Sequence, residues 1–388
     1  MPKSSDLIFG DIPSMPSLDF SLAGLTIRVE TADPSDLEWL EENLTPSFCA
    51  AVAESPLRIV TKIVDPGRHR ALLERGPASP VQQVTCFGFD GHGGACTRWS
   101  AAPTTLYDDE LGVFYELNEE GSRVEVVAPS ARPSTRIALL RLVREFAAHH
   151  LAAQGAVQIH AAALEHNGRG ILIVGPKRAG KTSLLIHSLR EAGSLFIAND
   201  RAVVSGDSQV GWRLGGMPTV ISIRPGTVEL LHRPGFLAAS RWSARMTLTE
   251  ALGTPADGPP ASAYRQLSIS PRQFCHAVDA GRVESAPLRA IVFPRVDTRR
   301  DGLQFSRLSA AGMGERLRPH LLDPADTVFR SDLAGAWSTA ESAEVLAGLQ
   351  AVIPAFECVL GQQAFSSGSA CSLLFAELDR TTDGPLPS

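Results

Sequence analysis

Residues 169–200 read RGILIVGPKRAGKTSLLIHSLREAGSLFIAND, and this stretch decides the fold. Its apolar run ILIV, at residues 171–174, is typical of a buried strand. After a glycine-bounded segment, residues 182–193 show helical spacing of apolar positions and end on a glycine. A second apolar strand, SLFIA, then leads to Asn199 and Asp200. The order strand, loop, helix, strand predicts a βαβ unit of an α/β protein.

The loop before the helix has the sequence of a phosphate-binding loop. Residues 175–182, GPKRAGKT, satisfy the pattern G-x-x-x-x-G-K-[ST]. Glycines let the backbone fold over a polyphosphate, and the helix N-terminus adds partial positive charge. The residues that we expect to bind the nucleotide are Gly175, Pro176, Lys177, Arg178, Ala179, Gly180, Lys181, Thr182 and Ser183.

We expect Lys181 and Thr182 to bind the nucleotide and its Mg²⁺, whereas the role of Lys177 and Arg178 is open. Lys181 would reach the β- and γ-phosphates, and the Thr182 hydroxyl would bind Mg²⁺. Lys177 and Arg178 are bulky for a loop that wraps phosphate, so we expect them to point outward. There they either add positive potential beside the γ-phosphate or are simply solvated.

The residues around the loop carry a resemblance to the catalytic core of the HPr kinase/phosphorylase-like family. In that family a histidine-bearing strand and a hairpin precede the phosphate loop, and an acidic pair ends the strand after the loop's helix. Here residues 157–174 read as strand, Asn-Gly turn and strand. His160 matches the strand histidine, and Asn199 and Asp200 match the acidic pair. The resemblance is good over residues 158–204 and looser to about residue 378.

This resemblance implies an α/β fold with a P-loop kinase-like core of the HPr kinase type. It implies an ATP- and Mg²⁺-dependent kinase that moves the γ-phosphoryl group to a hydroxyl, and family acceptors include a seryl side chain of a protein or peptide. Asp200 would bind Mg²⁺, accept the acceptor's proton, or do both, with Lys181 and His160 as further catalytic residues. The family usually has two carboxylates here, and Asn199 removes one of them. The family also allows a homo-oligomer.

Several alternatives stay open from the sequence. The acceptor is a protein or peptide serine or a small molecule such as a sugar, and Asn199 also suits a nucleotide-binding regulatory or scaffold protein without catalysis. His160 is either catalytic or a hydrogen-bonded core residue. Asp200 either belongs to the site or caps a turn. Asp297, at the end of the apolar run IVFPRVD, is the competing candidate for the metal-binding carboxylate.

The rest of the chain divides into parts on either side of a bridging helix. Residues 1–130 alternate β-like runs with turn signals, plus one helical stretch around residues 35–44, which predicts a smaller β-rich α+β domain that selects the partner. Residues 131–155 hold the bridging helix, with Gly155 at its C-cap. Residues 156–380 form the P-loop HPr kinase-like domain, and residues 381–388 are expected to be a disordered tail.

Composition narrows the class of partner. The 388 residues include 36 Lys+Arg and 42 Asp+Glu, a net charge of −6 spread along the chain, which disfavours a nucleic-acid binder. No run approaches the roughly 20 apolar residues of a membrane span. The N-terminal segment has no apolar core of a secretory signal, so we expect a cytoplasmic protein that does not bind a membrane. The six cysteines have no zinc spacing and are expected to be reduced.

Other polar positions have weaker functional signals. Arg224 either contacts phosphate or acceptor or forms a structural ion pair, and the Pro/Gly-rich residues 252–263 are long enough for a flap over the acceptor. The adjacent pairs Cys275-His276, Glu165-His166 and His149-His150 lack further ligands at metal-binding spacing, so no metal site is expected from them.

Overall fold

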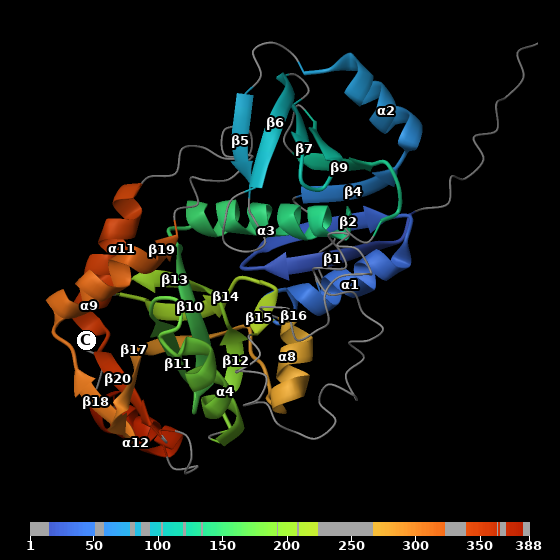
Figure 1. The fold of residues 1–388 in the computed structure, drawn as a ribbon. Coiled ribbons are helices and arrows are strands. Elements are labelled where there is room, and N and C mark those ends of the chain that lie inside the picture. The colour runs from blue at the N-terminus through green and yellow to red at the C-terminus, as the bar shows by residue number, and fades with distance from the viewer. Residues whose placement is uncertain are drawn as a thin grey trace, which may run out of the picture.

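The computed structural model describes residues 15–50, 58–77, 82–86, 94–101, 104–118, 122–132, 135–191, 193–207, 209–223, 267–322, 339–362, 364 and 370–382. These residues form two large mixed sheets with helices between and around them, so the chain is a mixed α/β protein (Figure 1). β15 (Ile221–Ile223) and β16 (Leu267–Ile269) form a separate two-stranded sheet, whose Ile221 and Ile269 pack in the core of the second large sheet. Arg224 and residues 252–263 lie outside the described residues.

The first sheet comes from the N-terminal third of the chain. Its strands, in spatial order, are β3 (Cys49–Ala50), β1 (Ser17–Leu22), β2 (Leu25–Thr31), β4 (Arg58–Val64), β9 (Arg123–Ala128), β8 (Val113–Leu117), β7 (Thr104–Asp108), β6 (Gly94–Ala101) and β5 (Gln82–Cys86). β2, β4 and β9 run parallel, and the other neighbours pair antiparallel.

Two helices follow parallel strands of this sheet, and both begin in the same way. The N-cap of α1 (Pro34–Leu44) is Asp33, which accepts from the Ser35 amide, and the N-cap of α2 (Pro66–Arg75) is Asp65, which accepts from the Arg68 amide. An aspartate N-cap followed by proline is a favourable helix start. The expected helix around residues 35–44 is thus confirmed as α1, whereas α2 was not expected from the sequence.

Helix α3 (Thr135–Ala153) lies between the two large sheets and is buried on nearly all sides (Figure 1). Its residues pack with the first sheet and α1 in one core that also takes in Val203 and Met217 from the following part of the chain. Gly155 follows it with a φ of 76°, as expected at a helix C-terminus. The bridging helix is therefore also a core element.

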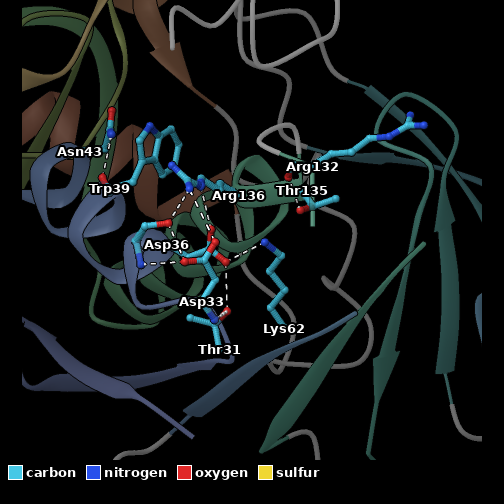
Figure 2. Close-up of polar contacts among 10 residues, drawn as sticks. Thr31, Asp33, Asp36, Trp39, Asn43, Lys62, Arg132, Thr135 and Arg136 are labelled. Carbon is cyan, nitrogen blue, oxygen red and sulfur yellow. Dashed lines mark hydrogen bonds and ion pairs between the residues drawn. The ribbon is translucent and has the colours of Figure 1, made fainter. Parts of the chain in front are cut away.

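An ion network fixes α3 to the first sheet. The Asp36 carboxylate of α1 accepts from Lys62 Nζ at 2.6 Å, from Arg136 Nε at 2.7 Å and from the Thr31 hydroxyl at 3.0 Å. Figure 2 shows Asp36 enclosed by these three partners, which come from β4, α3 and β2. Farther along α3, Arg141 pairs with Asp108 at 2.5 Å.

The second sheet contains β11, the strand that leads into the 175–182 loop. Its strands, in order, are β11 (Arg169–Val174), β10 (Val157–His166), β13 (Arg201–Asp207), β14 (Gly211–Gly216), β17 (Ser285–Asp301), β20 (Ala355–Gln362) and β18 (Leu303–Arg307), while β12 (Leu195–Ala198) and β19 (Leu321–Leu322) also pair with β10. β11 pairs with β10 antiparallel and with β17 parallel. Because β11 joins both, the pairings β10–β13–β14–β17–β11 close into a ring.

Helices cover both faces around β11. On one face, apolar residues of α4 (Lys181–Glu191), α8 (Pro271–Val278) and α12 (Ala370–Thr382) share a core with Ile171 and Ile173. On the other, residues of α9 (Ala310–Leu317) and α11 (Thr339–Val352) share a core with Leu172 and Val174. Alternate residues of a strand face opposite sides, so β11 is buried on both.

One sequence prediction for this region is confirmed, and the boundary of another differs by two residues. The Asn-Gly hairpin between β10 and β11 is present, with positive φ at Asn167 and Gly168. Helix α12 runs to Thr382, two residues into the stretch expected to be disordered, because apolar residues of its earlier turns are buried. Residues 383–388 lie outside the described part. Among the described helices, none is long and apolar enough to cross a membrane.

Candidate functional site

Residues 175–180 connect the end of β11 to the first turn of α4. The Ala179 amide donates to the Pro176 carbonyl over 3.1 Å, and the Leu184 amide donates to the Gly180 carbonyl over 2.9 Å. Arg178 and Gly180 have φ angles of 74° and 100°. The chain therefore turns tightly just before the helix N-terminus, whose unpaired backbone N–H groups are suited to an anion.

Close packing beneath the loop explains its two glycines. A Cβ on Gly175 would lie 3.0 Å from the Cβ of Ala179. A Cβ on Gly180 would lie 2.5 Å from Cδ1 of Leu360 and 3.3 Å from Cγ2 of Val296. The loop thus rests against β20 and β17, and Gly180 leaves no space for a side chain.

The outer side of the loop faces solvent. Pro176, Lys177 and Arg178 are exposed, whereas Ala179 is buried and Ser183 is half-buried. This exposure agrees with the outward orientation expected of the two cationic side chains.

Lys181 is the first residue of α4, and its side chain folds back over the loop. Its Nζ donates to the carbonyl of Gly175 over 2.5 Å and to that of Pro176 over 3.3 Å. Partial burial lowers the pKa of Lys181, and the Asp200 carboxylate opposes this effect. The ammonium group therefore lies on the loop and within electrostatic range of Asp200.

Thr182 meets the turn between β12 and β13. Its hydroxyl donates to Oδ1 of Asn199 over 3.4 Å, and Asn199 is 7% exposed. β12 and β13 both pair with β10, so the turn that joins them is held beside the first residues of α4.

Asp200 contacts His160 across this turn. His160 Nε2 lies 3.2 Å from Asp200 Oδ1, and both side chains are partly exposed, at 40% and 46%. The Ala161 amide also donates to the Asp200 carbonyl over 3.1 Å. Burial alone would raise the pKa of Asp200, but the hydrogen bond from His160 and the charges of His160, Arg201 and Lys181 hold this pKa below its usual value. The carboxylate is therefore ionised at neutral pH.

His320 lies beside this pair and was missed by the sequence analysis. Its ring is perpendicular to that of His160, with 6.1 Å between the ring centroids. Burial, Lys181 and His160 lower the pKa of His320. The segment RPHLL gives no signal of this position, because only the two-residue strand β19 brings His320 to the site.

Two buried arginines behind Asp200 were also missed. Arg201 is 9% exposed and Arg144, on α3, is 4% exposed. Burial lowers the pKa of Arg144 to about 9, and the charge of Arg201 contributes to this effect while Asp200 opposes it. The positive charges of both guanidinium groups therefore interact with the Asp200 carboxylate.

Asp297, the competing carboxylate, lies in the C-terminal part of β17 among arginines. Its oxygens are 3.2 Å from Arg295 Nη1, 3.3 Å from Arg299 Nε and 3.7 Å from Arg300 Nε. Metal binding by Asp297 would have to compete with these three cations.

The other histidines and the cysteine considered in the sequence lie in different surroundings. His150 contacts the Ala23 carbonyl at 2.9 Å, and the ring of His166 stacks on Phe375 at 3.9 Å between centroids. Burial raises the pKa of the Cys275 thiol to about 12, and His276 is exposed on α8. In the part of the chain that the structure describes, no group of three or more His, Cys, Asp or Glu residues is placed to hold a metal ion.

The oxygen atoms around Thr182 nevertheless suit Mg²⁺. Mg²⁺ prefers oxygen ligands and commonly uses one or two carboxylates together with substrate phosphates, so it does not need a cage of several acidic residues. The Thr182 hydroxyl lies beside the Asn199 amide oxygen, and the ionised Asp200 carboxylate follows directly in the chain. These are oxygen donors of the kind that Mg²⁺ uses.

No model of a known protein family matches the chain, and no curated protein matches it either. Contacts connect Lys181 to the loop, Thr182 to Asn199, and His160 to Asp200. The expected site residues are thus gathered at one end of β11, and Asp297 is held by other partners.

Proposed function

We propose that the protein is an ATP-dependent phosphotransferase with a P-loop kinase core of the HPr kinase type, which moves the γ-phosphoryl group to a hydroxyl. The observation that carries this proposal is the group formed by the 175–182 loop, Lys181 and the His160–Asp200 pair. Phosphoryl transfer needs mainly positioning and charge neutralisation, and these residues supply both.

Each residue has a role in the proposed reaction. The loop amides and Lys181 bind the phosphates, and the ammonium group leaves the Gly175 carbonyl to do so. Thr182 and Asp200 would hold Mg²⁺, which neutralises phosphate charge when bound. The acceptor oxygen bonds to the γ-phosphorus as the bond from that phosphorus to the β–γ bridging oxygen breaks, and ADP leaves. The acceptor's proton passes to Asp200, which His160 orients.

The acceptor that we favour is a serine of a protein or peptide, with a small-molecule hydroxyl as the alternative. Because the reaction consumes ATP, we place the protein in the cytoplasm, and a homo-oligomer is compatible with the proposal. A non-catalytic nucleotide-binding scaffold is the second candidate. The presence of Asn199 beside Thr182, where the resemblance implies a carboxylate, favours that candidate.

The test is transfer of label from γ-³²P-ATP, with Mg²⁺, to serine-containing peptides and to sugars. We expect transfer by the wild type and a loss of at least about 100-fold in Asp200→Asn, the size of a general-base contribution. Lys181→Ala should lose nucleotide binding as well, measured by calorimetry. Asp297→Asn is the matched control, since it removes a carboxylate in the C-terminal part of β17, the strand that pairs with β11.

The outcomes separate the candidates. Equal transfer by the wild type, Lys181→Ala and Asp200→Asn would remove the proposed assignment. Tight binding of Mg²⁺-ATP without transfer to any acceptor would favour the scaffold. A loss in Asp297→Asn as large as in Asp200→Asn would move the metal and base roles to Asp297.

A further inference from the structure

His320 is fixed beside the candidate site by backbone pairing. In the pairing of β19 with β10, Leu321 is opposite Ile159 and Leu322 is opposite Gln158. Because the strands are antiparallel, the residue before Leu321 lies next to the residue after Ile159, which is His160. The short helix η3 (Arg318–His320) ends at this position and leads into β19. The backbone thus places the two histidines together, and the perpendicular rings 6.1 Å apart agree.

The surroundings of His320 are cationic on the side of the loop. Partial burial lowers the pKa of its ring, and the charges of Lys181 and His160 lower it further. A neutral imidazole keeps one N–H donor and one acceptor nitrogen. A hydrogen-bond donor beside an ammonium group is well suited to an anion, and the anion that Lys181 would bind is a nucleotide phosphate.

We propose that His320 is a further substrate-contacting residue of this site, which donates a hydrogen bond to the terminal phosphate of a bound nucleoside triphosphate. The inference rests on the proposed function, since it requires that the loop binds a nucleotide. It adds a residue from η3, some 140 positions after the loop in the sequence, to the group formed by Lys181 and the His160–Asp200 pair. His320 therefore distinguishes a triphosphate from a diphosphate.

The test compares the affinities of AMP-PNP, a non-hydrolysable ATP analogue, and ADP, each with Mg²⁺, by calorimetry. We expect His320→Ala to weaken AMP-PNP binding about tenfold, the typical effect of one hydrogen bond to a charged group, and to leave ADP affinity within about twofold. His320→Gln keeps a donor and should restore most of the difference. His276→Ala, which removes an exposed histidine on α8, is the matched control and should change neither affinity.

A second measurement does not depend on the stability of the alanine variant. The imidazole proton signals of His320, assigned by their loss in His320→Gln, should shift in the NMR spectrum with AMP-PNP and stay nearly unchanged with ADP. Equal weakening of AMP-PNP and ADP would identify a structural role and overturn the inference, as would unchanged affinities in both His320 variants.

Failure of the inference and failure of the proposed function are distinguishable in the same data. If the wild type binds both nucleotides and the His320 variants behave like it, only the role of His320 falls. If the wild type binds neither nucleotide, the proposed function falls, and the role of His320 falls with it.

Discussion

Two residues of the 175–180 loop have positive φ, and only one of them is a glycine. Arg178, at 74°, adopts a backbone conformation that costs a residue with a side chain about 1–2 kcal/mol. Such conformations persist where the surrounding structure requires them, and they gather at ligand sites. The tight packing of Gly175 and Gly180 against the strands below supplies that requirement. The strained backbone at Arg178 is thus compatible with the phosphate-binding role that we propose for this loop.

Gly180→Ala is expected to damage both the loop and the fold around it. The new Cβ would meet a φ of 100° and would lie 2.5 Å from Cδ1 of Leu360, which is 3% exposed. We expect a loss of about 1–2 kcal/mol from the backbone conformation alone and a further loss from the clash. Nucleotide affinity should fall at least tenfold because the loop amides move. Urea unfolding and calorimetry with Mg²⁺-ATP measure the two effects.

Gly168→Ala is the control for that variant. Gly168 has a φ of 78°, but a Cβ there would have no heavy atom within 4 Å. The control should therefore show only the backbone cost and keep its nucleotide affinity. If the two variants lost the same stability and affinity, close packing under Gly180 would not be what shapes the loop.

The residues of the candidate site differ in how far the sequence predicts them. Lys181 and Thr182 follow from a local pattern of eight residues, because the backbone of such a loop places them directly. The pairing of His160 with Asp200 needs a tertiary contact between β10 and the turn after β12. The family resemblance indicated that both residues belong to the site, but not that they pair. His320 and Arg144 come from η3 and α3, and no local pattern links those segments to the loop.

At the scale of elements, sequence periodicity predicts the second sheet better than the first. Strand β11 and helix α4 have strong apolar patterns because both are deeply buried. Helix α2, PGRHRALLER, buries only His69 and Leu72, so its apolar signal is too weak to predict it. At one edge of the first sheet, β5 pairs with β6 and β6 pairs with β7. The sequence of one strand does not indicate which other strand it will pair with, so this order is not predictable from the sequence alone.

Asp36→Asn is expected to loosen α1, β4 and α3 from one another. The Asp36 carboxylate is fully buried, and its partner Lys62 is 2% exposed, so the variant leaves a buried ammonium group without its counter-charge (Figure 2). Breaking one side of a buried ion pair typically costs about 3–5 kcal/mol. We expect a loss of that size in the free energy of unfolding, measured by urea titration.

The matched control for Asp36 is a partly exposed ion pair in the first sheet. Asp19 binds Arg28 at 2.9 Å on β1 and β2, with both side chains partly exposed. Asp19→Asn should leave the unfolding midpoint nearly unchanged, because water and salt screen such pairs. If the two variants lost similar amounts of unfolding free energy, burial would not be the reason that the Asp36 ion pairs stabilise the fold.

At the scale of the whole molecule, one core joins the two large sheets. Residues of β2, β4, β8 and β9 pack with α3 and with Val203 and Met217, which belong to the part of the chain that carries the loop. The charge of Arg144, on this helix, interacts with the charges of Asp200 and Arg201. The N-terminal sheet is therefore part of the support beneath the candidate site.

This shared core predicts that the chain unfolds as one cooperative unit. Trp39 packs against the first core and Trp212 is buried in the core beneath β11, so single-tryptophan variants that keep one or the other report on the two sheets separately. We expect coincident urea transitions from the two reporters, because separating the sheets would expose both sides of α3 to water. We also expect Asp36→Asn, whose change lies near Trp39, to lower the Trp212 midpoint by the same amount. A Trp212 transition that stayed at its wild-type midpoint in Asp36→Asn would show instead that the loop-bearing sheet is stable without its N-terminal neighbour.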